Sequence, residues 1–127
     1  HFNGDLTGKK IAILGWAFKA NTNDSRESAS IKVSEILYKS NASIIIYDPM
    51  VKKTTIENDI QHLWDIENGV DNNRIKIVEK LNKTQQCDVF IILTEWEQFK
   101  YINIEESKVI FDGRNINQNK NKFSIGK

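Results

Sequence analysis

Two cations stand in the segment that follows the first strongly apolar run of this chain. The run is Ile11–Leu14, and it ends at Gly15. The next segment carries Lys19 and Arg26, shortly before a helical pattern begins at Ser28. The first N–H groups of a helix lack partners within the helix, and the helix dipole favours negative charge there. A strand, a short loop with two cations and a helix N-terminus together predict an anion pocket and favour a phosphate-bearing ligand.

Arg114 is a third cation that is placed to meet such a ligand. It follows Gly113, just after the apolar run Val109–Phe111, and the glycine allows a close approach or a positive φ. The planar guanidinium has five donors, which suit a diphosphate or sugar hydroxyls. The chain has only three arginines, so each one needs a reason. From position alone, Arg114 could equally be a turn residue that pairs with Asp112.

Ordinary surface roles are also open to the other two cations. Lys19 could be a solvated loop residue, since lysines are mostly exposed. Arg26 could pair with Asp24 or Glu27 at the surface. An arginine beside a helix N-terminus is unfavourable unless an anion lies nearby, which mildly favours a ligand role for Arg26.

Two carboxylates follow apolar runs and need separate treatment. Glu95 could orient a ligand or a neighbouring loop, but a capping or packing role is at least as open. Asp48 stands where a dinucleotide-binding fold places its ribose-binding acid. The Gly-x-Gly-x-x-Gly motif of that fold is absent, because Gly15 is the single glycine of its segment. The sequence therefore argues against an NAD-binding unit.

No residue of the chain is expected to be a catalytic nucleophile or a metal ligand. Cys87 has no neighbouring His, Lys or Arg to lower its pKa, so we expect a structural thiol. A single cysteine cannot form an internal disulfide, and His1 and His62 lie far apart without a metal-ligand pattern. A reduced, cytoplasmic compartment is expected.

The elements that position these residues follow from the apolar pattern. Six runs are expected to be strands: Lys9–Gly15, Ser43–Tyr47, Ile75–Val78, Asp88–Leu93, Val109–Phe111 and Phe123–Ile125. The first run does not alternate, which is typical of a strand buried on both faces of a parallel sheet. Helical segments are expected at Ser28–Asn41, around Ile56–Trp64, at Lys80–Gln86 and within Glu95–Glu106. For the first helix, Asp24 or Ser25 is the expected cap and Asn41 the expected end.

The alternation of strands and helices predicts the fold. It indicates an α/β domain with a doubly wound, mainly parallel, six-stranded Rossmann-like sheet and flanking helices. Ligands of such sheets bind outside the carboxyl ends of the strands, near the switch in strand order. The loops to inspect therefore follow the first, fourth and fifth strands: Trp16–Glu27, Thr94–Trp96 and Asp112–Asn115.

Length and charge exclude several classes of protein. At 127 residues the chain is long enough for one domain with a core and too short for two. Its net charge of +1, from 18 cations and 17 anions, leaves no electrostatic footprint for nucleic acid or for an anionic membrane. No apolar run approaches the length of a membrane span. Nucleic-acid and membrane partners are therefore not expected.

Several motifs resemble those of a known family. They are residues 15–28 (GWAFKANTNDSRES), Tyr47-Asp-Pro49, Leu93-Thr-Glu-Trp96 and Phe111-Asp-Gly-Arg114. Through almost its whole length the chain resembles the C-terminal, UDP-binding domain of the UDP-glucose/GDP-mannose dehydrogenase family, and most of all the eukaryotic-type UDP-glucose dehydrogenases. The resemblance is specific because several motifs occur in order at suitable intervals.

The resemblance implies roles for individual residues. Phe18, Lys19 and Arg114 match positions that contact the nucleotide-sugar substrate, and Arg26 matches one that faces the dinucleotide. Glu95 is at most a supporting residue. The catalytic cysteine of the family belongs to a motif of another domain, so no catalytic residue is implied here.

The resemblance also implies a longer parent enzyme. That enzyme would oxidise UDP-glucose to UDP-glucuronate, reduce two NAD⁺ that are bound mainly by a missing N-terminal domain, and form a homo-oligomer. Residues 1–8 would end the connection from a central helical region, and residues 9–127 would form the UDP-sugar-binding domain, which alone would be inactive. A sibling enzyme acting on GDP-mannose or a UDP-N-acetylhexosamine, or a stand-alone nucleotide-sugar-binding module, remains as an alternative.

Overall fold

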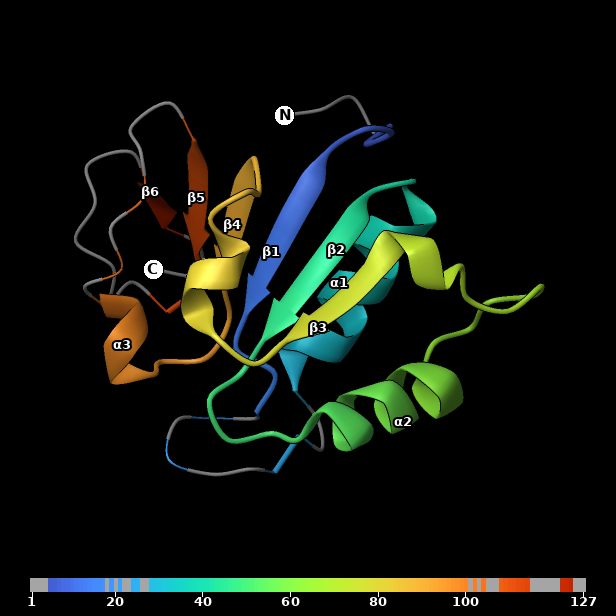
Figure 1. Ribbon diagram of the computed structural model, residues 1–127, viewed down its shortest axis with the longest axis horizontal. Coiled ribbons are helices and arrows are strands. Elements are labelled where there is room, and N and C mark those ends of the chain that lie inside the picture. The colour runs from blue at the N-terminus through green and yellow to red at the C-terminus, as the bar shows by residue number, and fades with distance from the viewer. Residues whose placement is uncertain are drawn as a thin grey trace.

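A parallel β-sheet forms the centre of the molecule (Figure 1). The computed structural model describes residues 5–17, 19, 21, 24–25, 28–100, 102, 104, 108–114 and 122–124, the last three for their backbone only. The strands are β1 (Lys10–Leu14), β2 (Ser43–Tyr47), β3 (Ile75–Val78), β4 (Val89–Ile92), β5 (Val109–Asp112) and β6 (Lys122–Ser124). The helices are α1 (Ala29–Lys39), α2 (Lys53–Leu63), α3 (Glu97–Lys100) and the 3₁₀ helices η1 (Asn72–Arg74) and η2 (Leu81–Thr84).

The strand order is β3-β2-β1-β4-β5-β6, and every neighbouring pair is parallel. The chain therefore runs from β1 outward to β3, returns to β4 beside β1, and continues in the opposite direction. In Figure 1, α1 lies behind the sheet and η2 in front of it, so the two faces are covered by different connections. This arrangement confirms the predicted parallel, Rossmann-like α/β fold and places the switch in strand order between β1 and β4.

The two central strands are buried almost completely because both faces of the sheet are covered. Residues 11–14 of β1 and all of β4 are buried, as the absence of alternation predicts. Buried side chains of β1, β2, β4, β5, α2 and α3 belong to one hydrophobic cluster. A single continuous cluster is what a chain needs to fold as an independent unit.

The boundaries of α1 differ from the prediction at one end. Ser28, and not Asp24 or Ser25, caps the helix, because its side chain accepts a hydrogen bond from the N–H of Ser30 at 3.2 Å. Ser25 is instead engaged elsewhere, since its hydroxyl donates to Asp59 of α2 at 2.6 Å. At the other end the prediction is confirmed: Asn41 lies just past the helix with a φ of +77°.

The predicted helices that follow are present with shifted bounds. The segment around Ile56–Trp64 forms α2, which begins at Lys53 and ends at Leu63, and Lys80–Gln86 contains only the 3₁₀ helix η2. The predicted sixth strand overlaps β6, although Ile125 lies outside the described residues. Within the described ranges, no helix combines the length and apolar character needed to cross a bilayer. The same ranges contain no group of three or more His, Cys, Asp or Glu side chains that could hold a metal ion.

Candidate functional site

The loops after β1, β4 and β5 meet at the edge formed by the carboxyl ends of the strands (Figure 1). The hydroxyl of Thr94, after β4, donates to the carbonyl of Ala17, after β1, at 2.9 Å. The Nε of Arg114, after β5, donates to the carbonyl of Leu93 at 3.2 Å. These contacts join segments that lie far apart in the sequence into one surface, as the strand order predicts.

Three of the predicted site residues are described, and all three lie at this edge. Lys19, Glu95 and Arg114 are exposed, each in a different loop of the three. The predicted positions Phe18 and Arg26 lie outside the described residues. The structure thus brings two cations to one edge of the sheet, while their roles toward a ligand stay predictions.

Gly15 allows the loop after β1 to lie directly against the end of β4. Its φ is +104°, a conformation that residues with a side chain rarely adopt. A Cβ at this position would overlap the side chain of Thr94 and lie 2.9 Å from its backbone nitrogen. The hydroxyl of Ser30, at the start of α1, donates to the Gly15 carbonyl at 2.5 Å. The turn is therefore fixed by its neighbours on two sides.

Asp48, which follows β2, is the polar centre of the edge. One carboxylate oxygen accepts from the backbone N–H of Trp16 at 2.7 Å, that of Ala17 at 2.9 Å and the indole N–H of Trp96 at 3.1 Å. The other accepts from the N–H groups of Met50 and Val51 at 2.8 and 2.9 Å. The side chain is buried. Asp48 therefore ties the loops after β1, β2 and β4 together.

Sequence reasoning missed this role of Asp48. It considered the residue only as a candidate ribose-binding acid, because it follows the second strand. The available signal was the Tyr47-Asp-Pro49 motif, since Asp before such a turn commonly accepts from the N–H groups two and three residues on. The donors of the other loops could not be identified, because they lie 31, 32 and 48 residues away.

The described residues do not fit a dinucleotide, although the fold is Rossmann-like. A pyrophosphate site in such a fold needs open space at the glycine turn after the first strand. Here Thr94 fills the space beside Gly15. The Asp48 carboxylate, in the position of the ribose-binding acid, already accepts five hydrogen bonds. The edge is thus built to hold its own loops and not an NAD of its own.

The loop after β1 has a second support from α2. Asp59 of α2 accepts from the indole N–H of Trp16 at 2.9 Å and from the hydroxyl of Ser25 at 2.6 Å. Trp16 is fully buried and Ser25 is buried as well. The ends of the segment that contains Lys19 are therefore fixed by buried contacts, while Lys19 itself is exposed.

The turn that carries Arg114 is also tightly built. Its backbone N–H donates to the buried carboxylate of Asp112 at 3.0 Å, and the N–H of Gly113 donates to the Ile92 carbonyl at 2.9 Å. A Cβ at Gly113 would lie 3.0 Å from that same carbonyl oxygen. The guanidinium of Arg114 therefore extends from a turn that is fixed to the end of β4.

Cys87 is a structural thiol, as predicted. It lies fully buried before β4. Burial raises the pKa of the Cys87 thiol to about 12, because the surroundings penalise the charged thiolate. The thiol therefore stays protonated near neutral pH, where a nucleophile would need the thiolate.

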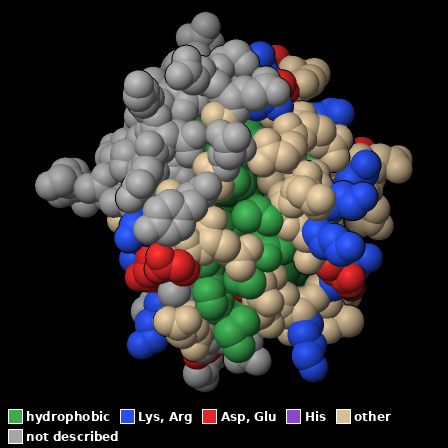
Figure 2. Space-filling model, turned by 60° about the vertical axis from the view of Figure 1, so that its left-hand side comes forward, with side chains coloured by type: hydrophobic (Ala, Val, Ile, Leu, Met, Phe, Trp, Pro, Cys, Tyr) green, Lys and Arg blue, Asp and Glu red, His purple; other side chains and the backbone are tan. Residues whose placement is uncertain are grey.

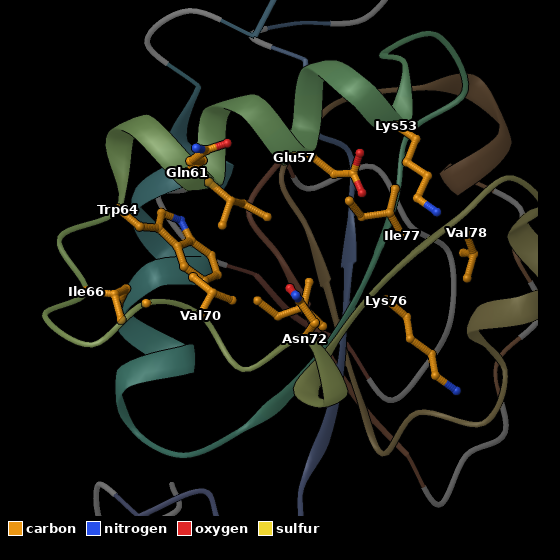
Figure 3. Close-up of a pocket in the computed structure, with 13 residues that line it drawn as sticks. Lys53, Glu57, Gln61, Trp64, Ile66, Val70, Asn72, Lys76, Ile77 and Val78 are labelled. Carbon is orange, nitrogen blue, oxygen red and sulfur yellow. The ribbon is translucent and has the colours of Figure 1, made fainter.

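A cavity of about 820 Å³ opens elsewhere, between α2 and β3 (Figure 3). Its lining is mixed: apolar side chains such as Ile60, Trp64 and Ile77 stand beside polar ones such as Glu57 and Lys76. Of the predicted site residues that the structure describes, none lines it. Ligands of parallel α/β sheets bind at the carboxyl ends of the strands, and the converging loops are there, so we place the candidate site at that edge.

Comparisons with known proteins agree on one family. The model of the UDP binding domain of the UDP-glucose/GDP-mannose dehydrogenase family matches residues 12–119. UDP-glucose 6-dehydrogenase of Caenorhabditis elegans is 36% identical over 130 residues, and that of Gallus gallus is 38% identical over 121 residues. These alignments cover 95% and 87% of this chain but only 26% and 24% of the relatives.

A solved structure supports the same relationship. A UDP-glucose dehydrogenase from the archaeon Pyrobaculum islandicum superposes with a TM-score of 0.74 and 29% sequence identity. The match covers 98% of this chain and 26% of that protein. The chain thus spans about a quarter of the length of the relatives that it matches.

Proposed function

The chain belongs to the UDP-glucose/GDP-mannose dehydrogenase family, whose UDP binding domain it matches, and from this premise we propose that its carboxyl-end edge binds the UDP moiety of a nucleotide sugar. One observation carries the proposal. Lys19 and Arg114, from loops that are distant in sequence, are exposed at the same edge of the sheet. A diphosphate needs such converging donors.

The chemistry of the two cations suits a diphosphate. The guanidinium of Arg114 offers planar, paired donors, and the ammonium of Lys19 offers a compact charge. Hydrogen bonds to charged groups each contribute about 1.5–3 kcal/mol. Phe18 matches a substrate-contacting position of the family, and we propose that it completes the contact from the same loop as Lys19.

We propose UDP-glucose as the nucleotide sugar, because the curated relatives at 36–38% identity are named UDP-glucose 6-dehydrogenases. The whole protein would then oxidise UDP-glucose to UDP-glucuronate in the cytoplasm, as a homo-oligomer. NAD⁺ supplies the hydride acceptor in that reaction and would be held mainly outside this chain, since the described edge does not fit a dinucleotide. Arg26 would face the cofactor from this side.

The surface of the molecule supports a partner domain. On the side that carries α3 and β5, hydrophobic side chains reach the surface in a band, with both basic and acidic side chains near its margins (Figure 2). Contiguous apolar surface of this kind is typical of regions that contact other polypeptide. We infer that the remainder of a longer polypeptide covers this side and completes the binding site.

Calorimetric titration of the 127-residue chain with UDP tests the proposal. Lys19→Ala and Arg114→Ala are each expected to weaken the Kd by about tenfold to a hundredfold, which is the loss of one charge-assisted contact. Lys10→Ala is the control, because it removes one exposed positive charge from the amino end of β1, at the sheet edge opposite the three loops. Equal affinities of the wild type and both edge variants would refute the proposed roles. Equal weakening in the Lys10 variant would show only a loss of overall charge.

A further inference from the structure

We propose that Asp48 is a positioning residue for nucleotide binding: it holds the loop that carries Lys19 in the geometry that the ligand requires. This inference rests on the proposed function. In this proposal, the position of the ligand-binding loop depends on a buried residue that does not itself contact the ligand. Lys19 is exposed at the surface, whereas Asp48 is buried and binds the backbone of the same loop at Trp16 and Ala17.

The two oxygens of Asp48 serve different segments. Among the described residues, Oδ1 accepts from the N–H groups of Met50 and Val51, two and three residues ahead, and so closes the turn after β2. Oδ2 accepts from residues of the loops after β1 and β4, namely Trp16, Ala17 and Trp96. The carboxylate thereby transfers the fixed geometry of its own turn to the loops after β1 and β4.

The residues that Asp48 binds lie close along the chain to the proposed ligand contact Lys19. Ala17, whose N–H it binds, lies two residues before Lys19. Trp96, whose indole it binds, follows Thr94, and Thr94 donates to the Ala17 carbonyl. Ala17 is therefore held at both its N–H and its carbonyl, two residues before Lys19.

Only a carboxylate can meet these five donors. An asparagine has one acceptor oxygen, and its NH₂ group must face the remaining donors. If the oxygen stays with Met50 and Val51, the NH₂ opposes the N–H groups of Trp16 and Ala17 and the Trp96 indole. Asp48→Asn therefore changes little volume but releases the loop after β1 or the turn after β2.

The direction in which Asp48→Asn changes the Kd for UDP distinguishes a positioning role from a purely electrostatic one. Asp48 is an anion beneath a proposed anion site, so removing its charge alone would strengthen UDP binding. Loss of loop geometry would weaken it. Loss of charge and loss of loop geometry therefore change the Kd in opposite directions. If Asp48 is a positioning residue, Asp48→Asn binds UDP more weakly than the wild type.

UDP titration of the 127-residue chain at a temperature where circular dichroism shows every variant folded provides the test. Asp48→Asn is expected to weaken the Kd by about tenfold or more, comparable to the loss of one charge-assisted contact. Trp96→Phe, which removes only the indole donor, is expected to weaken it by a smaller factor. In parallel, hydrogen exchange of the Trp16 and Ala17 amides should be slow in the wild type and fast in Asp48→Asn.

Glu35→Gln is the matched control. Glu35 is also a buried carboxylate that accepts from a backbone N–H, that of Asp65 at 2.6 Å, but its partners in the described part of the chain, Asp65, Lys32 and Lys39, lie outside the three loops. This variant should lose stability and keep the wild-type Kd. Unchanged or tighter UDP binding by Asp48→Asn, or equal weakening by Glu35→Gln, would overturn the positioning role and leave the proposed function standing. A wild-type chain that does not bind UDP would refute both.

Discussion

Buried carboxylates in this protein bind backbone N–H groups, whereas Lys19 and Arg114 are exposed at the edge of the sheet. Asp48 and Glu35 are 8% and 4% exposed, and each accepts from the backbone of another segment. Arg74 also bonds within the protein: its guanidinium donates to the carbonyls of Tyr38, in the last turn of α1, and of Ala42, just past the helix, and stacks on the Tyr38 ring at 3.9 Å. Of the three arginines, this one therefore has a structural role at the end of α1.

Glu35 gives a prediction at the residue scale. Desolvation acts to raise its pKa, but the hydrogen bond from the Asp65 N–H and the ion pair with Lys39 outweigh it, and the pKa lies below the usual 4.5. A lowered pKa in the folded state adds stability above the unfolded-state pKa, and this stability is lost as the pH falls through the folded-state pKa. We therefore expect Glu35→Gln to lower the free energy of unfolding by about 1–3 kcal/mol at pH 7, and by much less at pH 3.

Urea unfolding of the two proteins at both pH values measures this difference. The stability gap between wild type and Glu35→Gln should shrink as the solution becomes acidic. A gap of the same size at pH 3 and pH 7 would mean that the charge of Glu35 does not contribute to stability.

At the scale of elements, the sheet edge is shaped by how closely one loop approaches a neighbouring strand. Gly15 and Gly8 both have positive φ values, +104° and +82°. A Cβ at Gly15 would overlap Thr94, whereas a Cβ at Gly8 would meet no atom within 4 Å. Substitution of the two glycines therefore distinguishes two free-energy costs: that of a side chain in a positive-φ conformation, and that of a Cβ packed against Thr94.

Alanine substitution of the two glycines measures these costs. Gly8→Ala should lower the free energy of unfolding by about 1 kcal/mol, because only the backbone is strained. Gly15→Ala should lower it by about 2–5 kcal/mol, since overpacking against Thr94 adds to the strain. Thermal or urea unfolding provides the values. Equal losses for the two variants would show that the approach of Gly15 to Thr94 is not important for stability.

The elements themselves were largely predictable, because apolar runs and helical periodicity are local signals. The five strands β1–β5 appear where the apolar runs lie, and the edge shared by Lys19, Glu95 and Arg114 follows from parallel strand order alone. The predicted cap of α1 was wrong, because the hydroxyl of Ser25 donates to Asp59, a partner 34 residues away. The central role of Asp48 was missed for the same reason. Tertiary partners decide between residues of equal local propensity.

At the scale of the whole molecule, two regions with different chemistry can be compared as sites for a nucleotide. The cavity between α2 and β3 has a mixed lining, in which apolar side chains stand beside Lys53, Glu57 and Lys76 (Figure 3). The carboxyl-end edge has exposed cations on loops that are fixed by buried hydrogen bonds. Family membership and the position of the switch in strand order both favour the second region for a nucleotide.

Titration of the isotope-labelled 127-residue chain with UDP-glucose, followed by the chemical shifts of its backbone amides, tests this central claim most directly. The account predicts that the largest changes fall on residues 15–19, 93–96 and 112–114, in the loops after β1, β4 and β5. Changes centred on α2 and β3, around Trp64 and Lys76, would place the nucleotide in the cavity between these two elements and contradict the account.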